Sequence, residues 1–410
     1  MPEPHADGVA VYCDYAATTP VHPEVLEAMA PYFHGGFGNP SSAHHFGRRA
    51  RAALEDARTR LAAALEAEPD EIVFTGGGTE ADNLAVLGVS RALARAGARP
   101  FICCSPIEHK AVLAAVERAA AAGARTALLP LRPTGVVDLA GFDALAPSAP
   151  GLCSLMWVNN EVGTLQPVPA LVARCRALGL LCHTDAVQAF GKLPISVRQT
   201  PVDLLSLSGH KIGAPKGVGA LYLRRGTPIE PMVVGGGQES GLRPGTENVA
   251  FAVGLARAAE LALADREREQ ARLGELRDGF EAALRACCPE VQVHGAAGDR
   301  VPYISSLALP NPSGQSPTVL LDQLGVACSA GSACSARSPK PSHVLTAMGV
   351  CTEVARNTVR VSFGRETTSA NVDRLVAAMI DVIAQLRDAP APLTGDWNQV
   401  EPESREALAH

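Results

Sequence analysis

Two spacings of hydrophobic residues alternate between about residue 50 and residue 225. One predicted helix carries apolar residues at helical spacing, namely Leu54, Ala57, Leu61 and Leu65. Between the helical stretches stand short apolar runs that we interpret as buried strands: EIVF (71–74), FICC (101–104), LCSLMWV (152–158), LLCH (180–183) and LLSL (204–207). Because such strands alternate with helices, they predict a mostly parallel sheet that is covered by helices on both faces.

The second half of the chain has a different order of elements. Residues 255–286 contain no proline and carry an apolar stripe, which indicates one long helix. Three short strand-like runs follow: VQVHG (291–295), ISSLAL (304–309) and NTVRVSF (357–363). A last amphipathic helix has apolar residues in phase between Val372 and Leu386. This order predicts a smaller α+β unit after the long helix.

Together these patterns predict an α/β protein with two domains. We place a large domain at 15–262, and a small domain at 1–14 together with 263–388. Residues 389–410 show no hydrophobic period and are expected to form a loose tail.

Composition narrows the classes of function. The 410 residues are 47% hydrophobic and 19% charged, which is ordinary for a soluble folded protein. A net charge of −6 does not supply the basic surface that nucleic-acid binding needs. The first ten residues, MPEPHADGVA, do not resemble a signal peptide, and no apolar run reaches the roughly 18 residues that span a bilayer. We therefore expect a cytoplasmic protein with neither a nucleic acid nor a membrane as partner.

The chain contains eleven cysteines, and none of them forms a CxxC pair. This pattern fits neither the disulfide framework of a small secreted protein nor a zinc site, so no metal is predicted. Most of the thiols are expected to be small buried hydrophobic residues. Cys334 is the exception, because the surrounding ACSAGSACSARSPKPSHVL (327–345) has no apolar period and is typical of a loop.

A glycine-rich turn, TGGGTEADN (75–83), follows the first predicted strand. Its glycines allow close approach of the backbone, and Thr79 with Asp82 has the spacing of a capped helix start. A helix start with free N–H groups is suited to an anion, most naturally a phosphate. The turn lacks the GK[ST] of a nucleoside-triphosphate loop, and taken alone it is only weak support for a ligand.

Polar residues also follow the other predicted strands. They are Glu108-His109-Lys110, Asn159-Asn160-Glu161, Thr184-Asp185-Ala186-Val187-Gln188 and Ser208-Gly209-His210-Lys211. In a parallel sheet the groups just past the strand ends converge on one edge, where such sheets bind ligands. Each residue alone has an ordinary explanation as a surface charge, a helix cap or a structural histidine.

The combination of an amine, an acid, an imidazole and a phosphate cradle is what pyridoxal 5'-phosphate (PLP) requires. Lys211 would form the Schiff base, and Asp185 would keep the pyridinium nitrogen protonated. His109 would lie against the ring, and Gln188 would reach the ring hydroxyl.

Ten segments carry a family resemblance: YAATTPV, FGNPSSAHHFGRRAR, FTGGGTEADNLA, EHKAV, VNNEVGTLQPV, HTDAVQAFGKLPI, SGHKIGAPKGVGALY, GGGQESGLRPGTEN, GSACSARSPKPSHVL and VRVSFGR. In this order they resemble the cysteine desulfurases, which are fold-type I PLP enzymes related to the class V aminotransferases. The likeness runs from about residue 11 to residue 388. It implies a large domain with a seven-stranded-type, mostly parallel sheet.

The resemblance also implies roles for single residues. Lys211, His109, Asp185 and Gln188 match the residues that contact the PLP ring, and Cys334 matches the catalytic nucleophile. The remaining matches are to phosphate contacts (Gly78, Thr79, Ser208 and His210), to a threonine lent across a homodimer interface to the other subunit's phosphate (Thr246), and to the holders of the substrate carboxylate (Asn160 and Arg360).

The implied reaction converts L-cysteine to L-alanine and leaves the sulfur on Cys334 as a persulfide. A sulfur-acceptor protein, such as an iron–sulfur scaffold, or a tRNA-thiolation pathway would then receive the sulfur. Cys328 could resolve a persulfide, although its place at a predicted strand end favours a buried thiol. Many relatives have Ala where Gly78 stands, and Tyr-Gly-Pro-Lys where this chain has Gly213-Ala214-Pro215-Lys216.

Three alternatives stay open at this point. A selenocysteine lyase shares several of the motifs, but its vertebrate members have an acidic residue where this chain has Lys110. A transaminase of class V would use the Lys211 machinery without Cys334. A sulfur-carrier or scaffold protein would have lost turnover altogether.

Overall fold

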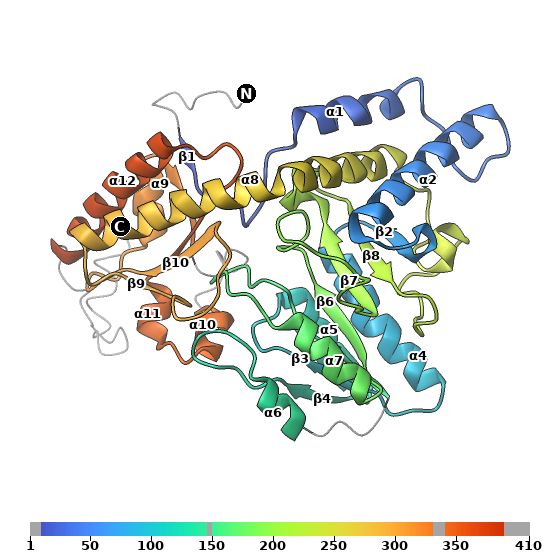
Figure 1. Cartoon of the computed structure of the whole chain (residues 1–410), viewed down its shortest axis with the longest axis horizontal. Helices are drawn as coiled ribbons and strands as arrows, with labels where there is room; N and C mark the ends of the chain where they lie inside the picture. Colours follow the sequence, from blue (N-terminus) through green and yellow to red (C-terminus); the bar gives the residue numbers. More distant parts are fainter. Residues whose placement is uncertain (1–9, 146–149, 331–340, 389–410) are drawn as a thin grey trace, which may run out of the picture.

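The computed structural model describes residues 10–145, 150–330 and 341–388. Its larger sheet has seven strands in the order β2-β8-β7-β6-β5-β3-β4 (Figure 1). The strands are β2 (Ile72–Thr75), β3 (Phe101–Cys104), β4 (Arg125–Leu128), β5 (Gly151–Ser154), β6 (Leu181–Asp185), β7 (Leu204–Ser208) and β8 (Gly219–Leu223). Only β8 runs antiparallel to its neighbours, β2 and β7. The predicted mostly parallel sheet is therefore confirmed.

All five predicted strands belong to this sheet, and two further strands were not predicted. The predicted run 152–158 is too long, because β5 ends at Ser154 and the following residues form a loop. The edge strand β4 was missed because its RTAL sequence is mostly exposed and lacks an apolar run. The glycine-containing β8 was missed because its sequence gives no sign of an antiparallel strand inside a parallel sheet.

Helices cover both faces of the large sheet. One face packs against the helical stretch α3 (Gly78–Asn83), η3 (Leu84–Gly88) and α4 (Val89–Arg95), and against α5 (Lys110–Ala121). The other face packs against α2 (His45–Leu65), α7 (Val168–Ala177) and α8 (Val249–Cys287). Neighbouring residues of one strand take opposite faces, since Ile102 belongs to the first core and Cys103 to the second.

The long helix α8 connects the large sheet to a second, smaller part of the molecule. It packs against α1 (Pro23–Met29) and α2 at its beginning and against α12 (Ser369–Asp388) further on (Figure 1). Helix α8 begins at Val249, earlier than the predicted 255, because Asn248 caps it by accepting the Phe251 N–H. The division into two domains near residue 262 stays a prediction.

The smaller part contains an antiparallel sheet in the order β12-β13-β10-β9. Its strands are β12 (Ser329–Ala330), β13 (Thr358–Ser362), β10 (Ile304–Ala308) and β9 (Gln292–Val293). A separate parallel pair joins β1 (Val11–Tyr12) to β11 (Val326–Ala327), so the start of the described chain pairs with its last quarter. Three short helices complete this region: α9 (Pro317–Gln323), α10 (His343–Ala347) and α11 (Thr352–Arg356). One further short helix, α6 (Leu139–Ala144), follows the edge strand β4 in the chain.

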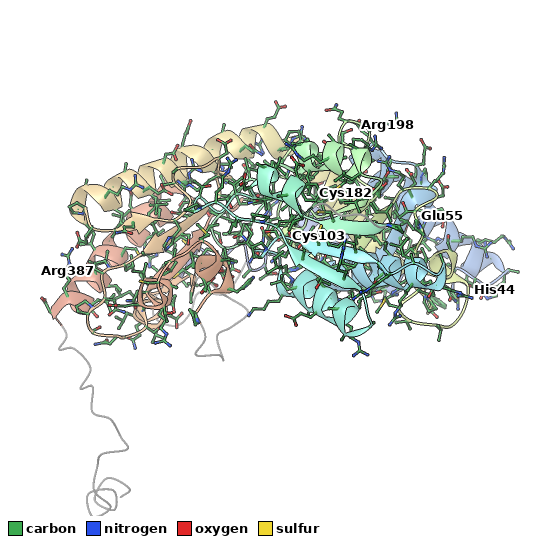
Figure 2. The ribbon with its side chains drawn as sticks, turned by 90° about the horizontal axis from the view of Figure 1, so that it is seen from below. His44, Glu55, Cys103, Cys182, Arg198 and Arg387 are labelled. Carbon is green, nitrogen blue, oxygen red and sulfur yellow. The ribbon has the colours of Figure 1, made fainter. Side chains whose placement is uncertain are left out.

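The cysteines within the described ranges are free thiols, and most of them are buried. Cys103 and Cys182 lie inside the sheet region, as expected for small hydrophobic residues (Figure 2). Cys287 and Cys351 are exposed. Across residues 10–145, 150–330 and 341–388, no helix has the length and apolar character to cross a membrane, and no group of three or more His, Cys, Asp or Glu side chains is arranged to hold a metal ion.

Candidate active site

A cavity of about 410 Å³ lies at the carboxyl ends of the parallel strands. The structure brings the predicted site residues together around it apart from Thr246, while Cys334 lies outside the described residues. The predicted residues in its wall are Gly78, Thr79, His109, Asn160, Asp185, Gln188, Ser208, His210, Lys211 and Arg360. The convergence of all of them except Arg360 follows from the large sheet, because β2, β7, β6, β5 and β3 all end at this edge.

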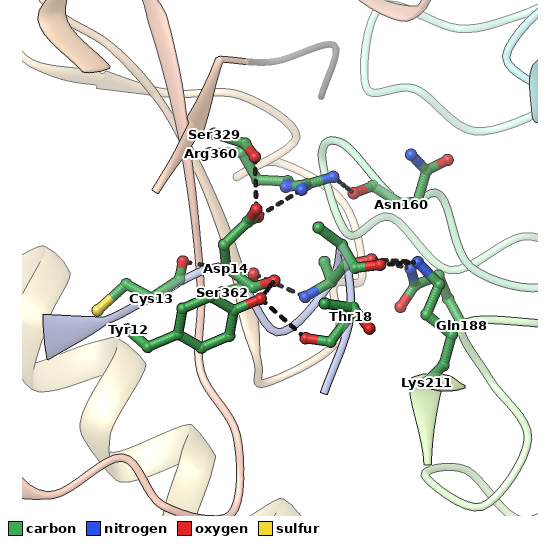
Figure 3. Close-up of polar contacts among 12 residues, drawn as sticks. Tyr12, Cys13, Asp14, Thr18, Asn160, Gln188, Lys211, Ser329, Arg360 and Ser362 are labelled. Atoms are coloured by element: carbon green, nitrogen blue, oxygen red, sulfur yellow. Dashed lines mark hydrogen bonds and ion pairs between the residues drawn. The ribbon is translucent and has the colours of Figure 1, made fainter. Parts of the chain in front are cut away.

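Lys211 stands on a short 3₁₀ turn, η4 (Gly209–Lys211), immediately after β7. Its Nζ donates hydrogen bonds to the carbonyl oxygens of Ala16 at 2.6 Å and Ala17 at 2.7 Å (Figure 3). The N-terminal segment therefore aligns the amine inside the cavity. Neither alanine was predicted as a site residue, since a backbone carbonyl leaves no signal in the sequence.

Asp185 is the last residue of β6 and is buried. Its Oδ1 accepts the Val187 N–H at 2.8 Å. Burial raises the pKa of Asp185, and the nearby His109 and Lys211 charges oppose that rise. The carboxyl group is thus positioned where a cationic N–H in the cavity would hold it in the ionised form.

A second carboxyl group, that of Asp82, lies beside Asp185 in the cavity wall. Burial and the charge of Asp185 raise the pKa of Asp82 well above its usual value. Its Oδ1 has no hydrogen-bond partner within the described parts of the chain. The predicted Thr79–Asp82 cap is wrong: α3 begins after Gly77 with no side-chain cap, and Asp82 is turned into the interior because the helix packs against the sheet.

The glycine-rich turn forms one end of the cavity. A Cβ on Gly78 would lie 2.8 Å from Val187 Cγ2 and 3.5 Å from Ser208 Cβ, so only glycine fits without a shift. A hollow beside the turn is lined by Thr79, Ser208, His210 and Lys216. The turn opens a continuous helical stretch from Gly78 to Arg95, so its first N–H groups face this hollow without intrahelical partners.

His210 adds a neutral donor to the same end. Burial and the Lys211 and Lys216 charges lower the pKa of His210 to about 4, so the ring is uncharged at neutral pH. Its Nδ1 lies 3.1 Å from Thr18 Oγ1. The turn, the hydroxyl groups and the histidine together suit a phosphate group.

His109 caps helix α5, which fixes its ring at the cavity wall. Its Nδ1 accepts the Ala111 N–H at 3.1 Å, so a neutral ring carries its proton on Nε2. The adjacent Glu108 is fully buried and its Oε1 accepts the Met156 N–H at 2.7 Å. Burial raises the pKa of Glu108 well above its usual value. Glu108 therefore supports the loop after β5 and does not face the cavity as an acid.

Arg360 comes from β13 in the smaller sheet and is 1% exposed. Its Nη2 donates to Asp14 Oδ1 at 2.6 Å, and its Nη1 donates to the Asn160 carbonyl oxygen at 2.9 Å (Figure 3). Asp14 Oδ2 also accepts the Ser329 hydroxyl at 2.7 Å. Asp14 is thus a functional residue that sequence reasoning missed, because it lies 346 residues from its partner.

Cys334 lies outside the described residues, but the chain on both sides of it is fixed at the cavity. Ser329 is bonded to Asp14, and the Ser342 hydroxyl donates to Glu161 Oε2. His343 forms part of the cavity wall, and its Nε2 lies 2.9 Å from the Glu108 carbonyl oxygen. Burial raises the pKa of Glu161 to about 7. Because it accepts the Ser342 hydroxyl, the carboxyl group of Glu161 holds the chain just after residue 340 in place.

Two other predicted residues lie away from the cavity. Cys328 is partly buried, and burial raises the pKa of its thiol, which favours the strand-end interpretation over a resolving nucleophile. Thr246 is exposed in the segment before α8 and is not among the described residues that line the cavity.

Comparisons with known proteins agree with this architecture. The family model for the class V aminotransferases matches residues 11–375. The cysteine desulfurase IscS of Dictyoglomus turgidum is 42% identical over 387 residues, which are 94% of this chain and 98% of that protein. The cysteine desulfurase NifS of Azotobacter vinelandii is 41% identical over 387 residues, 94% of this chain and 96% of that protein.

Solved structures of similar proteins have the same fold as this chain. A NifS-like protein superimposes with a TM-score of 0.85 at 35% identity, covering 92% of this chain and all of that one (100%). SspA in complex with cysteine superimposes with a TM-score of 0.77 at 34% identity, covering 86% of this chain and 98% of that one. The chain belongs to the class V aminotransferase family. Within that family it is a cysteine desulfurase of the IscS and NifS type, and its cofactor is PLP.

The cavity itself also fits PLP. The carboxyl groups of Asp185 and Asp82 in the cavity wall suit a protonated ring nitrogen, and Lys211 would supply the amine that links to the aldehyde. The hollow beside the glycine-rich turn, which is lined by Thr79, Ser208 and His210, suits the phosphate. The residues present therefore match each end of the cofactor.

Proposed function

We propose that the protein converts L-cysteine to L-alanine and takes the sulfur onto Cys334 as a persulfide. One observation supports this most strongly. Lys211, Asp185 and Arg360 line one cavity, and the described residues on both sides of the 331–340 segment are fixed to that cavity's wall. The solved relative SspA, in complex with cysteine, has the same fold.

We assign the PLP contacts as the sequence predicted. Lys211 would hold the aldehyde carbon, Asp185 the ring nitrogen and His109 the ring face, while Gln188 would donate to the ring hydroxyl. The phosphate would lie against Gly78, Thr79, Ser208 and His210. When bound, PLP supplies an electron sink for the carbanion that forms at the substrate Cα.

The substrate is positioned by residues of both parts of the molecule. Arg360 would bind the substrate carboxylate with its planar fork, assisted by Asn160. Asp14 keeps the guanidinium in place between substrate molecules, because it neutralises the buried charge. Lys211, once released from the cofactor as a free amine, would move the Cα proton at its Nζ.

The sulfur step belongs to Cys334. Its thiolate would form a bond to the substrate sulfur while the C–S bond of the substrate breaks, and the electron pair of that bond stays on carbon, which takes up a proton to give alanine. Cys334 is four residues from Ala330, a distance of at most about 14 Å along an extended chain. Ala330 pairs with β13 beside Arg360, and this short chain separation supports the assignment of Cys334 as the nucleophile.

The experiment that tests this proposal compares three proteins. Wild type should release alanine and sulfide from L-cysteine in the presence of a thiol reductant. Cys334→Ser should bind PLP with an unchanged absorption spectrum and release almost no sulfide, whereas Lys211→Ala should lose both turnover and the lysine-linked absorption. A Cys334→Ser enzyme that retains turnover would instead support a transaminase, and a colourless wild-type protein would support a sulfur carrier.

Substrate preference is decided by the same assay with L-selenocysteine. Lys110, which follows His109, favours cysteine over selenocysteine. Activity on selenocysteine alone would reverse this order.

We further propose that the enzyme is a cytoplasmic homodimer that passes sulfur to an acceptor protein, such as an iron–sulfur scaffold, or into tRNA thiolation. Several large apolar side chains are exposed near α1, α2 and the loop before α8, as expected for a surface that another copy covers: Phe33, Phe37, Phe46, Val233 and Val234. Thr246 adjoins this loop and is exposed, so a partner subunit could receive it. Free buried thiols such as Cys103 accord with a reducing compartment.

A mixed dimer tests the role of Thr246. Lys211→Ala subunits and Thr246→Ala subunits each carry one defect. When they are mixed, each heterodimer has two active sites, and the subunit that Thr246 serves decides how the two defects are distributed between those sites. If Thr246 serves the partner, one site of each heterodimer has both defects and the other site has neither, so activity recovers on mixing. Absence of recovery, with heterodimers verified by native mass spectrometry, would overturn the assignment.

A further inference from the structure

Lys192 lies directly behind Gln188, outside the cofactor cavity. Its Nζ donates to Gln188 Oε1 at 3.3 Å and stands 4.5 Å from the centre of the Tyr303 ring. It lines a second cavity of about 150 Å³, whose wall also includes Tyr303 and Lys211. Lys192 was not identified from the sequence, and the proposed reaction gives it no task.

The carboxamide of Gln188 is held in one orientation by two neighbours. The Ala16 carbonyl oxygen can only accept, and it accepts from Gln188 Nε2 at 2.8 Å. The Lys192 ammonium can only donate, and it donates to the opposite side of the amide at Oε1. Both contacts require the same assignment of nitrogen and oxygen, so a rotation of the amide by 180° would place two donors, and two acceptors, against each other.

We propose that Lys192 is a positioning residue that locks the Gln188 amide with its NH₂ group, not its oxygen, available to the ring hydroxyl of PLP. The proposal rests on the assignment of Gln188 made above. One amide hydrogen is taken by Ala16, and the second is the only one left for the cofactor. A deprotonated ring oxygen can only accept, so an inverted amide would repel it.

The surroundings of Lys192 show that its position is specific. Burial, together with the charge of Lys211, lowers the pKa of Lys192 to about 7, so the ammonium form, which can only donate, predominates below that pH. The Tyr303 ring and the Gln188 oxygen both attract the ammonium, and they offset part of the free-energy cost of removing it from water. Tyr303 also donates from its hydroxyl to the Gln188 backbone oxygen at 2.7 Å, so the same turn is held at its main chain. Among the described residues, Lys192 is the one that donates a hydrogen bond to the amide oxygen of Gln188.

The test measures the affinity of the apo-protein for PLP and the absorption maximum of the bound cofactor, independently of turnover, at a pH below 7, where Lys192 is an ammonium. Lys192→Met removes the donor and keeps most of the side-chain volume, and it should weaken PLP binding about tenfold, which is the loss of one hydrogen bond to a charged group. The absorption maximum should shift in the same direction as in Gln188→Met. Lys192→Arg, which can still only donate, should restore both values toward wild type.

A matched control separates this role from a merely structural one. Gln270 on α8 donates to the Lys192 backbone oxygen, so Gln270→Met loosens the same turn without touching the ammonium. It should lower the unfolding midpoint and leave the absorption maximum unchanged. If Gln188→Met alters affinity and spectrum but Lys192→Met does not, the lock is wrong. If Gln188→Met itself has no effect, the assignment of Gln188 to the cofactor fails, whatever Lys192 does.

Discussion

Replacing Gly78 by alanine should disturb the cofactor site through Val187. The added Cβ would stand 2.8 Å from Val187 Cγ2, well inside the about 3.5–4.0 Å at which carbon atoms are in favourable contact. Val187 cannot simply rotate away, because its β-branched side chain has few allowed rotamers. Ser208 Cβ would lie 3.5 Å from the same Cβ, already in van der Waals contact, so the turn has little room to shift toward it. We therefore expect a loss of about 1–3 kcal/mol in the free energy of unfolding, the usual cost of overpacking.

The same clash should reach the cofactor, because the Val187 N–H donates to Asp185 Oδ1. Gly78→Ala should weaken PLP binding to the apo-protein as well as lowering stability. The compensating variant is Val187→Ala, which removes the methyl group that alanine at 78 would strike. Since Val187 is only partly buried, this single change should cost little by itself.

A double-mutant cycle measures the coupling. Urea unfolding and PLP titration are performed on wild type, on each single variant and on Gly78→Ala/Val187→Ala. The double variant should be more stable than Gly78→Ala alone, giving a favourable interaction energy of about 1 kcal/mol or more. Additive effects, or a Gly78→Ala variant as stable as wild type, would refute the reasoning.

Three further outcomes are expected. Arg360→Lys should raise KM for cysteine at least about tenfold with a smaller change in kcat, because an ammonium cannot form the two parallel hydrogen bonds that a guanidinium makes to a carboxylate. Steady-state kinetics measure this, and equal KM values would contradict it. Asp14→Ala should cost about 3 kcal/mol in unfolding free energy by leaving the buried Arg360 charge unpaired, as measured in urea; an unchanged midpoint would exclude that ion pair as a stabilising contact. Burial raises the pKa of Glu161 from 4.5 to about 7, so the folded state binds this proton more tightly than the unfolded state does. As the pH rises through that interval, the free energy of unfolding of wild type should fall by up to about 3 kcal/mol relative to that of Glu161→Gln. Unfolding at pH 5 and pH 8 measures the difference, and an equal gap at both values would contradict the raised pKa.

The sequence predicted the parallel strands and the positions just beyond them, because both depend on local patterns. Lys211 and Asp185 follow apolar runs that are buried on both faces, so their convergence follows from strand direction alone. The strand β4 was not predicted because it lies at the sheet edge, where its side chains are mostly exposed and need not be apolar. The capping role given to Asp82 failed because tertiary packing, which turns that carboxyl group inward, outweighed a local motif.

The supporting residues of the site could not be predicted by the same means. Asp14 acts through Arg360, and Glu161 acts through Ser342, 181 residues away. Lys192 acts on a neighbouring amide, yet only the orientation of both side chains reveals the contact. Such contacts depend on how the two sheets face each other, and no periodicity in the chain records it.

The order of synthesis gives the segment from Val11 to Thr19 a particular place in folding. It is translated before the strands of the large sheet, yet its partners β11 and Arg360 are translated after that sheet. Until they arrive, Ala16 and Ala17 cannot be brought into register against Lys211 by the pairing of β1. Before β11 and β13 have folded, only contacts within the large part, such as the hydrogen bond from the Thr19 N–H to the His210 carbonyl oxygen, can hold this segment, so the vitamin pocket is complete only when both parts of the molecule have formed.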